Sequence, residues 1–187
     1  MEESLAPLTK FLLNSRSKKM PLLPLNENYI FSKAPWLTWK ELLFGLNRGY
    51  IDEDGVSKYA CNTLTELSSE KAYELASLEP EELSFTHDIL VFLADKNETE
   101  ESEITKPWIF LLLSHYLDNK HLLKDPLETI EELYAEFDYP EEISSIVRYM
   151  PPPEGMDGSE TRLYENWKNI ISNYNDYFNN QRDHKND

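Results

Sequence analysis

The sequence offers very little sulfur. Its 187 residues include one cysteine, Cys61, so an internal disulfide and a zinc site built from several cysteines are both excluded. A chain without disulfides suits a reducing compartment, and we therefore expect a cytoplasmic protein. Cys61 lies between Ala60 and Asn62 on an otherwise ordinary helical stretch, where we expect it to fill space in the core rather than to act as a nucleophile.

Glycine and long apolar runs are also scarce. The five glycines are scattered singly, which excludes a glycine-rich phosphate-binding loop. The longest apolar run, WIFLLL at 108–113, is far shorter than the roughly 20 residues that a membrane-spanning helix needs. The amino terminus places acids before its short apolar patch, which is the wrong order for a secretory signal. We expect neither a membrane span nor export.

Positive charge is in deficit. The chain has 18 Lys and Arg against 35 Asp and Glu, a net charge of −17. Binding to nucleic acid depends largely on Lys and Arg, so we expect no nucleic-acid partner. Residues 1–20 hold four basic and two acidic residues, whereas residues 127–160 hold ten acids and one arginine, Arg148. Electrostatics favours basic proteins or cations as partners, although a need for solubility explains the acids equally well.

The residues that are abundant predict a folded helical protein. Hydrophobic residues make up 40% and aromatic residues 12% of the chain, enough for a core, and the length suits one domain. No strand-like alternation stands out except a short patch at 29–31. We predict an all-α, single-domain helical bundle of about seven helices. Residues 1–35 form a partly irregular N-terminal segment, 36–178 the helical domain and 179–187 a frayed tail.

Capping and periodicity place the main helices. Thr38 and Glu41 have the spacing of a capping box, and Gly49 fits the helix end. Thr105 and Pro107 open a segment that is apolar almost all round to Leu117, which predicts a central helix covered by its neighbours. The further helical stretches that we expect are 56–67, 80–93, 127–137, 141–150 and 161–178.

The helix expected at 127–137 carries acids of one sign on its outer side. An apolar stripe packs inward, and the opposite side is expected to face water. Like charges four residues apart disfavour a helix slightly, so a partner that supplies Lys or Arg would explain the pattern, though chance explains it nearly as well. Tyr139 lies beyond the stripe and is a candidate aromatic anchor. The predicted partner-binding residues are Glu128, Glu131, Glu132, Glu136 and Tyr139.

The segment 134–153, YAEFDYPEEISSIVRYMPPP, mixes aromatics, acids and prolines. Asp138 and Glu141 have capping-box spacing around Pro140, and the prolines at 151–153 forbid continuation of the helix that follows. The segment therefore predicts a corner between two helices, with a structural role favoured over a binding role.

No spacing of residues points to catalysis or to a cofactor. The four histidines lack metal-ligand spacing, and we expect no metal and no cofactor. An enzyme that uses carboxylates or a divalent metal remains the alternative, with Glu132, Glu136 and Asp138 as its candidate cluster. A scaffold or regulatory adaptor is the third hypothesis.

Three stretches resemble a known bacterial family. They are LTWKELLFGLNRGYID, PWIFLLLSHYLDNK and DPLETIEELYAEFDYPEEISSIVRYMPP. Together they resemble the family DUF2247 over roughly residues 36–175. The resemblance implies a neighbour of polymorphic toxin genes, and such neighbours are often cytoplasmic immunity proteins. It implies no catalytic residue. The expected function is therefore a non-enzymatic immunity protein that binds and neutralises a basic toxin domain.

Overall fold

The computed structural model describes residues 20–94, 101–152, 154–155 and 158–183. These residues form eight α-helices and three short 3-10 helices, and no strand occurs within these ranges, so the predicted all-α class is confirmed. The elements in chain order are α1 (Glu27–Lys33), α2 (Trp39–Arg48), α3 (Glu53–Thr63), α4 (Glu70–Ala76), η1 (Pro80–Phe85), α5 (Thr86–Ala94), α6 (Glu101–Asp118), η2 (Lys120–Leu122), α7 (Pro126–Glu136), η3 (Glu141–Ile146) and α8 (Glu160–Asp183).

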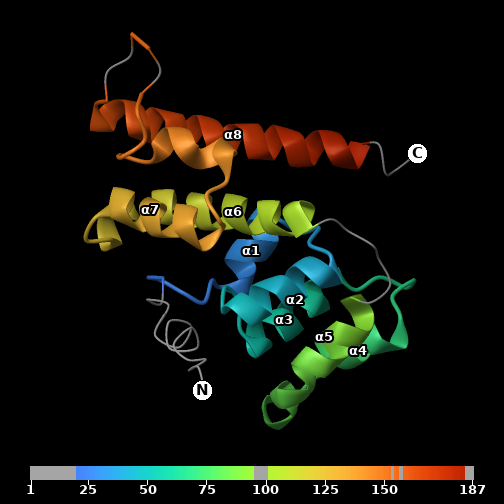
Figure 1. Ribbon diagram of the computed structural model, residues 1–187. Helices are drawn as coiled ribbons and strands as arrows, with labels where there is room; N and C mark the ends of the chain where they lie inside the picture. The colour runs from blue at the N-terminus through green and yellow to red at the C-terminus, as the bar shows by residue number, and fades with distance from the viewer. Residues whose placement is uncertain (1–19, 95–100, 153, 156–157, 184–187) are drawn as a thin grey trace, which may run out of the picture.

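The helices are arranged around α6 (Figure 1). The long helix α8 lies across one side of α6 and α7, and α1, α2 and α3 lie on the other side. The pair α4 and α5 lies farthest from α8 and packs on α2 and α3. Because α6 contacts α2, α7 and α8, it has neighbours on several sides. This is the environment that its apolar sequence predicts.

The burial of α6 confirms its central position. Residues 108–113 are each at most 2% exposed. The helix begins at Glu101, four residues before the predicted start at Thr105, and Pro107 lies within its first two turns. Only the first four N–H groups of a helix lack an intrahelical partner, so Pro107, the seventh residue of α6, removes one helical hydrogen bond.

Two tryptophans fasten α6 to the helices on either side. The Trp108 Nε1 group donates to the Glu41 carbonyl of α2 at 2.7 Å, and the Trp167 Nε1 group of α8 donates to the Leu113 carbonyl at 3.1 Å. Both indoles are fully buried, so these bonds satisfy their polar atoms. Gly45 lets α2 approach closely, since a Cβ atom there would lie 1.9 Å from the Trp108 ring.

The start of α2 follows the sequence signals. The Thr38 side chain accepts from the Glu41 N–H and the Glu41 carboxylate accepts from the Thr38 N–H, so the predicted capping box is confirmed. Gly49 ends the helix in the left-handed region, at φ 72°, which glycine adopts without a steric penalty.

The strand-like patch at 29–31 is helical and forms part of α1. Asn26 caps this helix by accepting from the Asn28 and Tyr29 N–H groups. The Tyr59 hydroxyl of α3 donates to the Ala34 carbonyl at 2.6 Å and accepts from the Leu37 N–H at 2.9 Å. Part of the segment assigned to an N-terminal extension thus joins the core, through Met20, Leu25, Ile30 and Ala34.

The stretch predicted as one helix over 80–93 consists of two elements, η1 and α5, and α4 precedes them without having been predicted. A 3-10 helix advances about 120° per residue and an α-helix about 100°, so side chains before and after the junction do not share one face. Ile89 and Leu93 are buried, whereas Phe85 and Phe92 are 56% and 54% exposed.

Two further expectations for this part of the chain are wrong. The helix predicted over 56–67 ends as α3 at Thr63, and Leu67, beyond its end, is 96% exposed. Cys61 is exposed rather than part of the core, because the buried face of α3 is formed by Val56, Tyr59 and Ala60.

The last helix is longer than predicted. Of the residues expected on its inner stripe, Leu163, Trp167, Ile170, Tyr174 and Phe178 are buried, whereas Ile171 and Tyr177 are half-buried. The helix continues to Asp183, through the first part of the predicted tail, and residues 184–187 lie outside the described part of the chain. Within the described residues, α6 and the other helices are all too short or too polar to span a bilayer.

Candidate functional site

The predicted corner is built by the backbone rather than by a capping box. After α7 ends, Asp138 and Tyr139 both have positive φ, 58° and 60°. The Tyr139 N–H donates to the Tyr134 carbonyl at 2.8 Å, which satisfies one of the last carbonyls of α7. Asp138 is therefore not the extended residue that a helix N-cap requires. The predicted Asp138–Glu141 capping box is wrong.

The element after the corner is also shorter than predicted. In place of an α-helix over 141–150, the six-residue 3-10 helix η3 follows Pro140, and no side chain caps it. Ile143, Ile146 and Val147 are buried, but Met150 is 37% exposed. The chain thus leaves the core before residues 148–150 and presents them at the surface.

Three tyrosines gather at this turn, and we call Tyr134, Tyr139 and Tyr149 the tyrosine corner. The Tyr134 ring is buried and serves as its base. Its centroid lies 5.2 Å from the Tyr139 ring, in an edge-to-face contact, and 6.4 Å from the Tyr149 ring. Tyr139 and Tyr149 are 58% and 59% exposed. Partial burial, followed by the influence of its two neighbouring tyrosines, raises the pKa of the Tyr149 hydroxyl.

The acids of α7 do not form the uniform water-facing side that was predicted. Glu128 is exposed, whereas Glu131, Glu132 and Glu136 are half-buried. A helix whose apolar stripe is this wide, and whose neighbours approach on two sides, leaves only part of its circumference to water. The expectation that all four glutamates are solvated is therefore wrong for three of them.

Two of these glutamates are held by arginines from distant parts of the chain. Arg148 binds Glu131 through two bonds, Nε to Oε1 at 2.8 Å and a second guanidinium nitrogen to Oε2 at 3.1 Å. Arg148 also donates to Asp125 at 2.8 Å. These two carboxylates raise the pKa of the Arg148 guanidinium, and the backbone N–H of Glu128, together with Arg148, lowers the pKa of Asp125.

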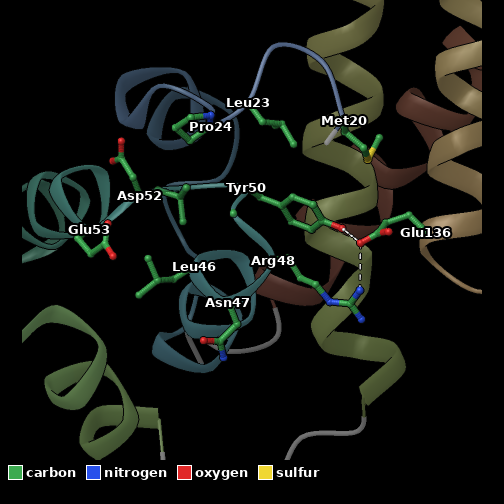
Figure 2. A pocket seen from close by; sticks show the side chains of 12 residues that line it. Met20, Leu23, Pro24, Leu46, Asn47, Arg48, Tyr50, Asp52, Glu53 and Glu136 are labelled. Atoms are coloured by element: carbon green, nitrogen blue, oxygen red, sulfur yellow. Dashed lines mark hydrogen bonds and ion pairs between the residues drawn. The ribbon is translucent and has the colours of Figure 1, made fainter. Parts of the chain in front are cut away.

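Glu136 lies at the wall of a cavity of about 520 Å³ (Figure 2). Arg48 and Tyr50, from the end of α2 and the residues after it, both point toward its Oε1 atom, at 3.0 and 3.3 Å. Burial, and then the nearby Glu136 carboxylate, raises the pKa of Tyr50. The lining also includes Met20, Leu23 and Pro24 and, across the cavity from Glu136, Asp52 and Glu53 at the start of α3.

No sequence pattern signals these pairings. Arg48 and Tyr50 precede Glu136 by 88 and 86 residues, and a spacing pattern detects neighbours on one element only. The cluster proposed for the alternative enzyme, Glu132, Glu136 and Asp138, does not come together as a metal site. Among the described residues, no three His, Cys, Asp or Glu side chains are grouped so that they could hold a metal ion.

The site therefore has two parts with different chemistry. At the tyrosine corner, Tyr139 and Tyr149 are exposed, and the exposed acids Glu141 and Glu142 follow Tyr139 by two and three residues, a combination suited to contact with a basic protein surface. At the cavity, Glu136 is already engaged by an arginine and a tyrosine. The structure places the two predicted binding residues Tyr139 and Glu136 in different parts.

Comparison with known proteins gives one match. Residues 28–175 match the family model described as "Uncharacterized protein conserved in bacteria (DUF2247)". No curated protein and no solved structure matches the chain. The matched range includes most of α1, which lies before the predicted start of the resemblance at residue 36, the tyrosine corner, and the cavity lining from Leu46 to Glu136 but not Met20, Leu23 and Pro24. Because the match covers most of the chain, this protein belongs to the DUF2247 family of bacterial proteins.

Proposed function

We propose that this chain is a cytoplasmic immunity protein that neutralises a bacterial toxin domain by binding it directly, and that it acts without catalysing a reaction. The observation that carries the proposal is the tyrosine corner, where Tyr139 and Tyr149 expose more than half of their surface. Tyrosine is among the residues that most often dominate the free energy of protein binding, because its ring buries a large area at a small entropic cost.

The backbone at the corner supports a binding role. Residues other than glycine seldom adopt positive φ, and an aromatic residue does so rarely. Here Asp138 and Tyr139 do so in succession, and their conformation directs the Tyr139 ring onto Tyr134 and outward. Strained residues of this kind are concentrated at functional sites.

Electrostatics supports a basic partner. The chain carries a net charge of −17, and acids around an interface accelerate the encounter with a basic surface. The predicted set of interface charges requires revision, since Glu131 and Glu136 are bound to arginines. The exposed acids Glu128, Glu141 and Glu142 take their place.

The proposal is tested by expressing the chain together with a toxin-like product of a neighbouring gene. We expect growth to be restored and the two proteins to copurify as a complex. Persistent growth arrest with both proteins present, and no copurification, would show that the proposal is wrong for that toxin and remove its main support.

Point variants then locate the interface. We expect Tyr139→Ala combined with Tyr149→Ala to weaken the complex at least tenfold, since such anchors commonly contribute about 2 kcal/mol or more each. Phe85→Ala is the matched control, because Phe85 is an equally exposed aromatic residue on η1. Equal loss of binding in the control and in the double variant would exclude the tyrosine corner as the specific interface.

A further inference from the structure

Helix α5 is apolar on its outer side as well as on the side that packs inward. The helix lies against α2, α3 and α4, and its buried residues are Thr86, Ile89, Leu90, Leu93 and Ala94. Its outer side exposes Val91 and Phe92, and Asp88 is the one Asp, Glu, Lys or Arg residue in the helix. A helix that is apolar all round is normally covered on all sides, as α6 is. The outer side of α5 is therefore a surface that we expect a partner to cover.

Exposed apolar side chains are concentrated in this part of the molecule. Ten large hydrophobic residues of the described chain are exposed, and five of them are Leu67, Tyr73, Phe85, Val91 and Phe92. We call residues 64–94, which include α4, η1 and α5, the α4–α5 lobe. The lobe lies farthest from α8 (Figure 1), whereas η3, which lies between Tyr139 and Tyr149 in the chain, packs on α8. The lobe and the tyrosine corner are therefore separate surfaces.

A groove of about 350 Å³ lies between α4 and α5. Its lining consists of Phe85, Ile89 and Phe92 and of three charged residues, Lys71, Glu74 and Asp88. Phe85 and Phe92 are each more than half exposed, so a partner can contact both rings. Lys71 is bound to Glu74 at 2.6 Å, and the Asp88 carboxylate therefore leaves the lining with one net negative charge.

The lobe as a whole is strongly acidic. It contains seven Asp and Glu residues and one basic residue, Lys71, which gives a net charge of −6. All seven acids are exposed, and they are Glu66, Glu70, Glu74, Glu79, Glu81, Glu82 and Asp88. A partner with an apolar side bordered by Lys and Arg complements the lobe in both hydrophobicity and charge.

The same charge disfavours other occupants of the groove. A second copy of the chain, docked lobe to lobe, would bring together two surfaces that each carry a charge of −6, and contacts between like charges cost affinity. An anionic membrane surface and nucleic acid would both repel the lobe for the same reason. A basic protein segment is the occupant that the lobe fits.

We propose that the groove of the α4–α5 lobe binds a basic amphipathic helix of a partner protein. Such a helix binds by laying its apolar side into a groove. Phe85 and Phe92 are seven residues apart, about 10 Å along a helix, which corresponds to two turns of the bound helix. The apolar side of that helix covers the two rings, and its Lys and Arg residues face Asp88 and the other acids of the lobe. The inference concerns a different surface from the tyrosine corner and does not depend on the proposed immunity function.

The test uses the full-length protein and two synthetic peptides of leucine and lysine, which have the same length and composition. One peptide repeats leucine at helical positions i, i+3, i+4 and i+7, so that it has one apolar side. The other distributes its leucines around the helix. Fluorescence anisotropy of labelled peptide measures each dissociation constant. We expect the amphipathic peptide to bind about tenfold more tightly or better, because the two peptides carry the same charge and only this one has an apolar side for the groove.

Variants then locate the binding site. Phe85→Ser combined with Phe92→Ser removes both exposed rings and no charge, and should weaken binding of the amphipathic peptide about tenfold. Tyr139→Ala combined with Tyr149→Ala removes two equally exposed rings outside the lobe and is the control, which should leave binding unchanged. Circular dichroism should show both variants folded. Asp88→Lys should weaken binding several-fold, and more at low than at high salt, because salt screens the charge that it reverses.

Three results would overturn the inference. The first is equal affinity for the two peptides, which would reduce the binding to simple charge attraction. The second is wild-type affinity for the amphipathic peptide in the variant that lacks both phenylalanines. The third is a dimer of the wild-type protein in sedimentation velocity that the same variant abolishes, which would assign the groove to a second copy of the chain.

Discussion

Helix α6 and the tyrosine corner are both rich in large side chains, yet they place them in opposite environments. Trp108, Phe110 and Tyr116 of α6 are at most 1% exposed, whereas Tyr139 and Tyr149 of the corner are more than half exposed. The helix is regular and is covered by its neighbours on several sides. The corner turns on two residues with positive φ and is packed on its inner side alone, against Tyr134.

The contrast shows how each region serves the molecule. Removing water from α6 supplies a large part of the free energy of folding, since each large buried side chain contributes roughly 1.5 to 3 kcal/mol. The exposed rings of the corner contribute little to folding, and their apolar area is available for a partner. Substitutions should therefore divide into those that unfold the protein and those that affect binding.

The largest effect is expected in α6. Leu112 is fully buried, so Leu112→Ala should lower the free energy of unfolding by about 2 to 5 kcal/mol, because it leaves a cavity in the core. Urea denaturation followed by circular dichroism measures this change. Leu67→Ala, at an almost fully exposed site, should change stability by no more than about 0.5 kcal/mol. Equal effects of the two substitutions would contradict the central position of α6.

A second substitution tests the close approach of α2 to α6. The Cβ atom of an alanine at Gly45 would lie 1.9 Å from the Trp108 ring, and Trp108 is buried and cannot move freely. Gly45→Ala should therefore lower the free energy of unfolding by about 1 to 3 kcal/mol through overpacking, although alanine is the better helix former. At Gly158 an added Cβ atom meets nothing within 4 Å, so Gly158→Ala is the control and should be nearly neutral.

Much of the fold was predictable because its signals are local. The Thr38–Glu41 capping box lies within one helical turn. Residues 108–117 are apolar on almost every side of the helix, so their burial can be predicted without knowing which side faces the core. The split of 80–93 into η1 and α5 was not predictable in the same way, because a change from α to 3-10 geometry alters the facing of side chains without altering their sequence spacing.

The candidate site was less predictable because it depends on contacts between distant residues. Tyr139 was correctly expected to lie off the buried stripe. The glutamates of α7 were expected to be solvated because their arginine partners, Arg48 and Arg148, lie on other elements. No pattern within α7 reports a bond that spans 88 residues. A helix surface inferred from one helix alone therefore overestimates how many of its charges are available to a partner.

The start of α7 should show an intermediate effect that depends on pH. Asp125 caps the helix by accepting from the Leu127 and Glu128 N–H groups and also binds Arg148. Asp125→Ala should lower the free energy of unfolding at pH 7 by about 0.5 to 2 kcal/mol, the usual range for a lost cap. Glu128→Ala, in the same turn but exposed, is the control.

The pH dependence follows from the lowered pKa of Asp125. A carboxyl group with a lowered pKa in the folded state stabilises that state fully above its ordinary pKa, near 4, and loses this contribution as the pH falls through the folded value. The stability difference between wild type and Asp125→Ala should accordingly shrink as the pH is lowered from 5 toward 2. A difference that stays constant over that range would exclude an ionised cap as its source.

The smallest effect distinguishes the paired from the exposed glutamates of α7. Glu136→Gln weakens the bonds to Arg48 and Tyr50, and because the pair is partly exposed, the loss should be about 0.2 to 1 kcal/mol. Glu128→Gln removes the same charge at an exposed position on the same helix and should be neutral or slightly stabilising, since it relieves repulsion with Glu132. Thermal unfolding of both variants at low and high salt measures the difference between their free energies of unfolding.

If high salt reduces this difference, the attraction between Glu136 and Arg48 is its cause, because salt screens the charges of that pair. If Glu128→Gln is the more destabilising substitution, the four glutamates belong to one solvated face after all, and Glu136 returns to the set of charges that a basic partner can reach.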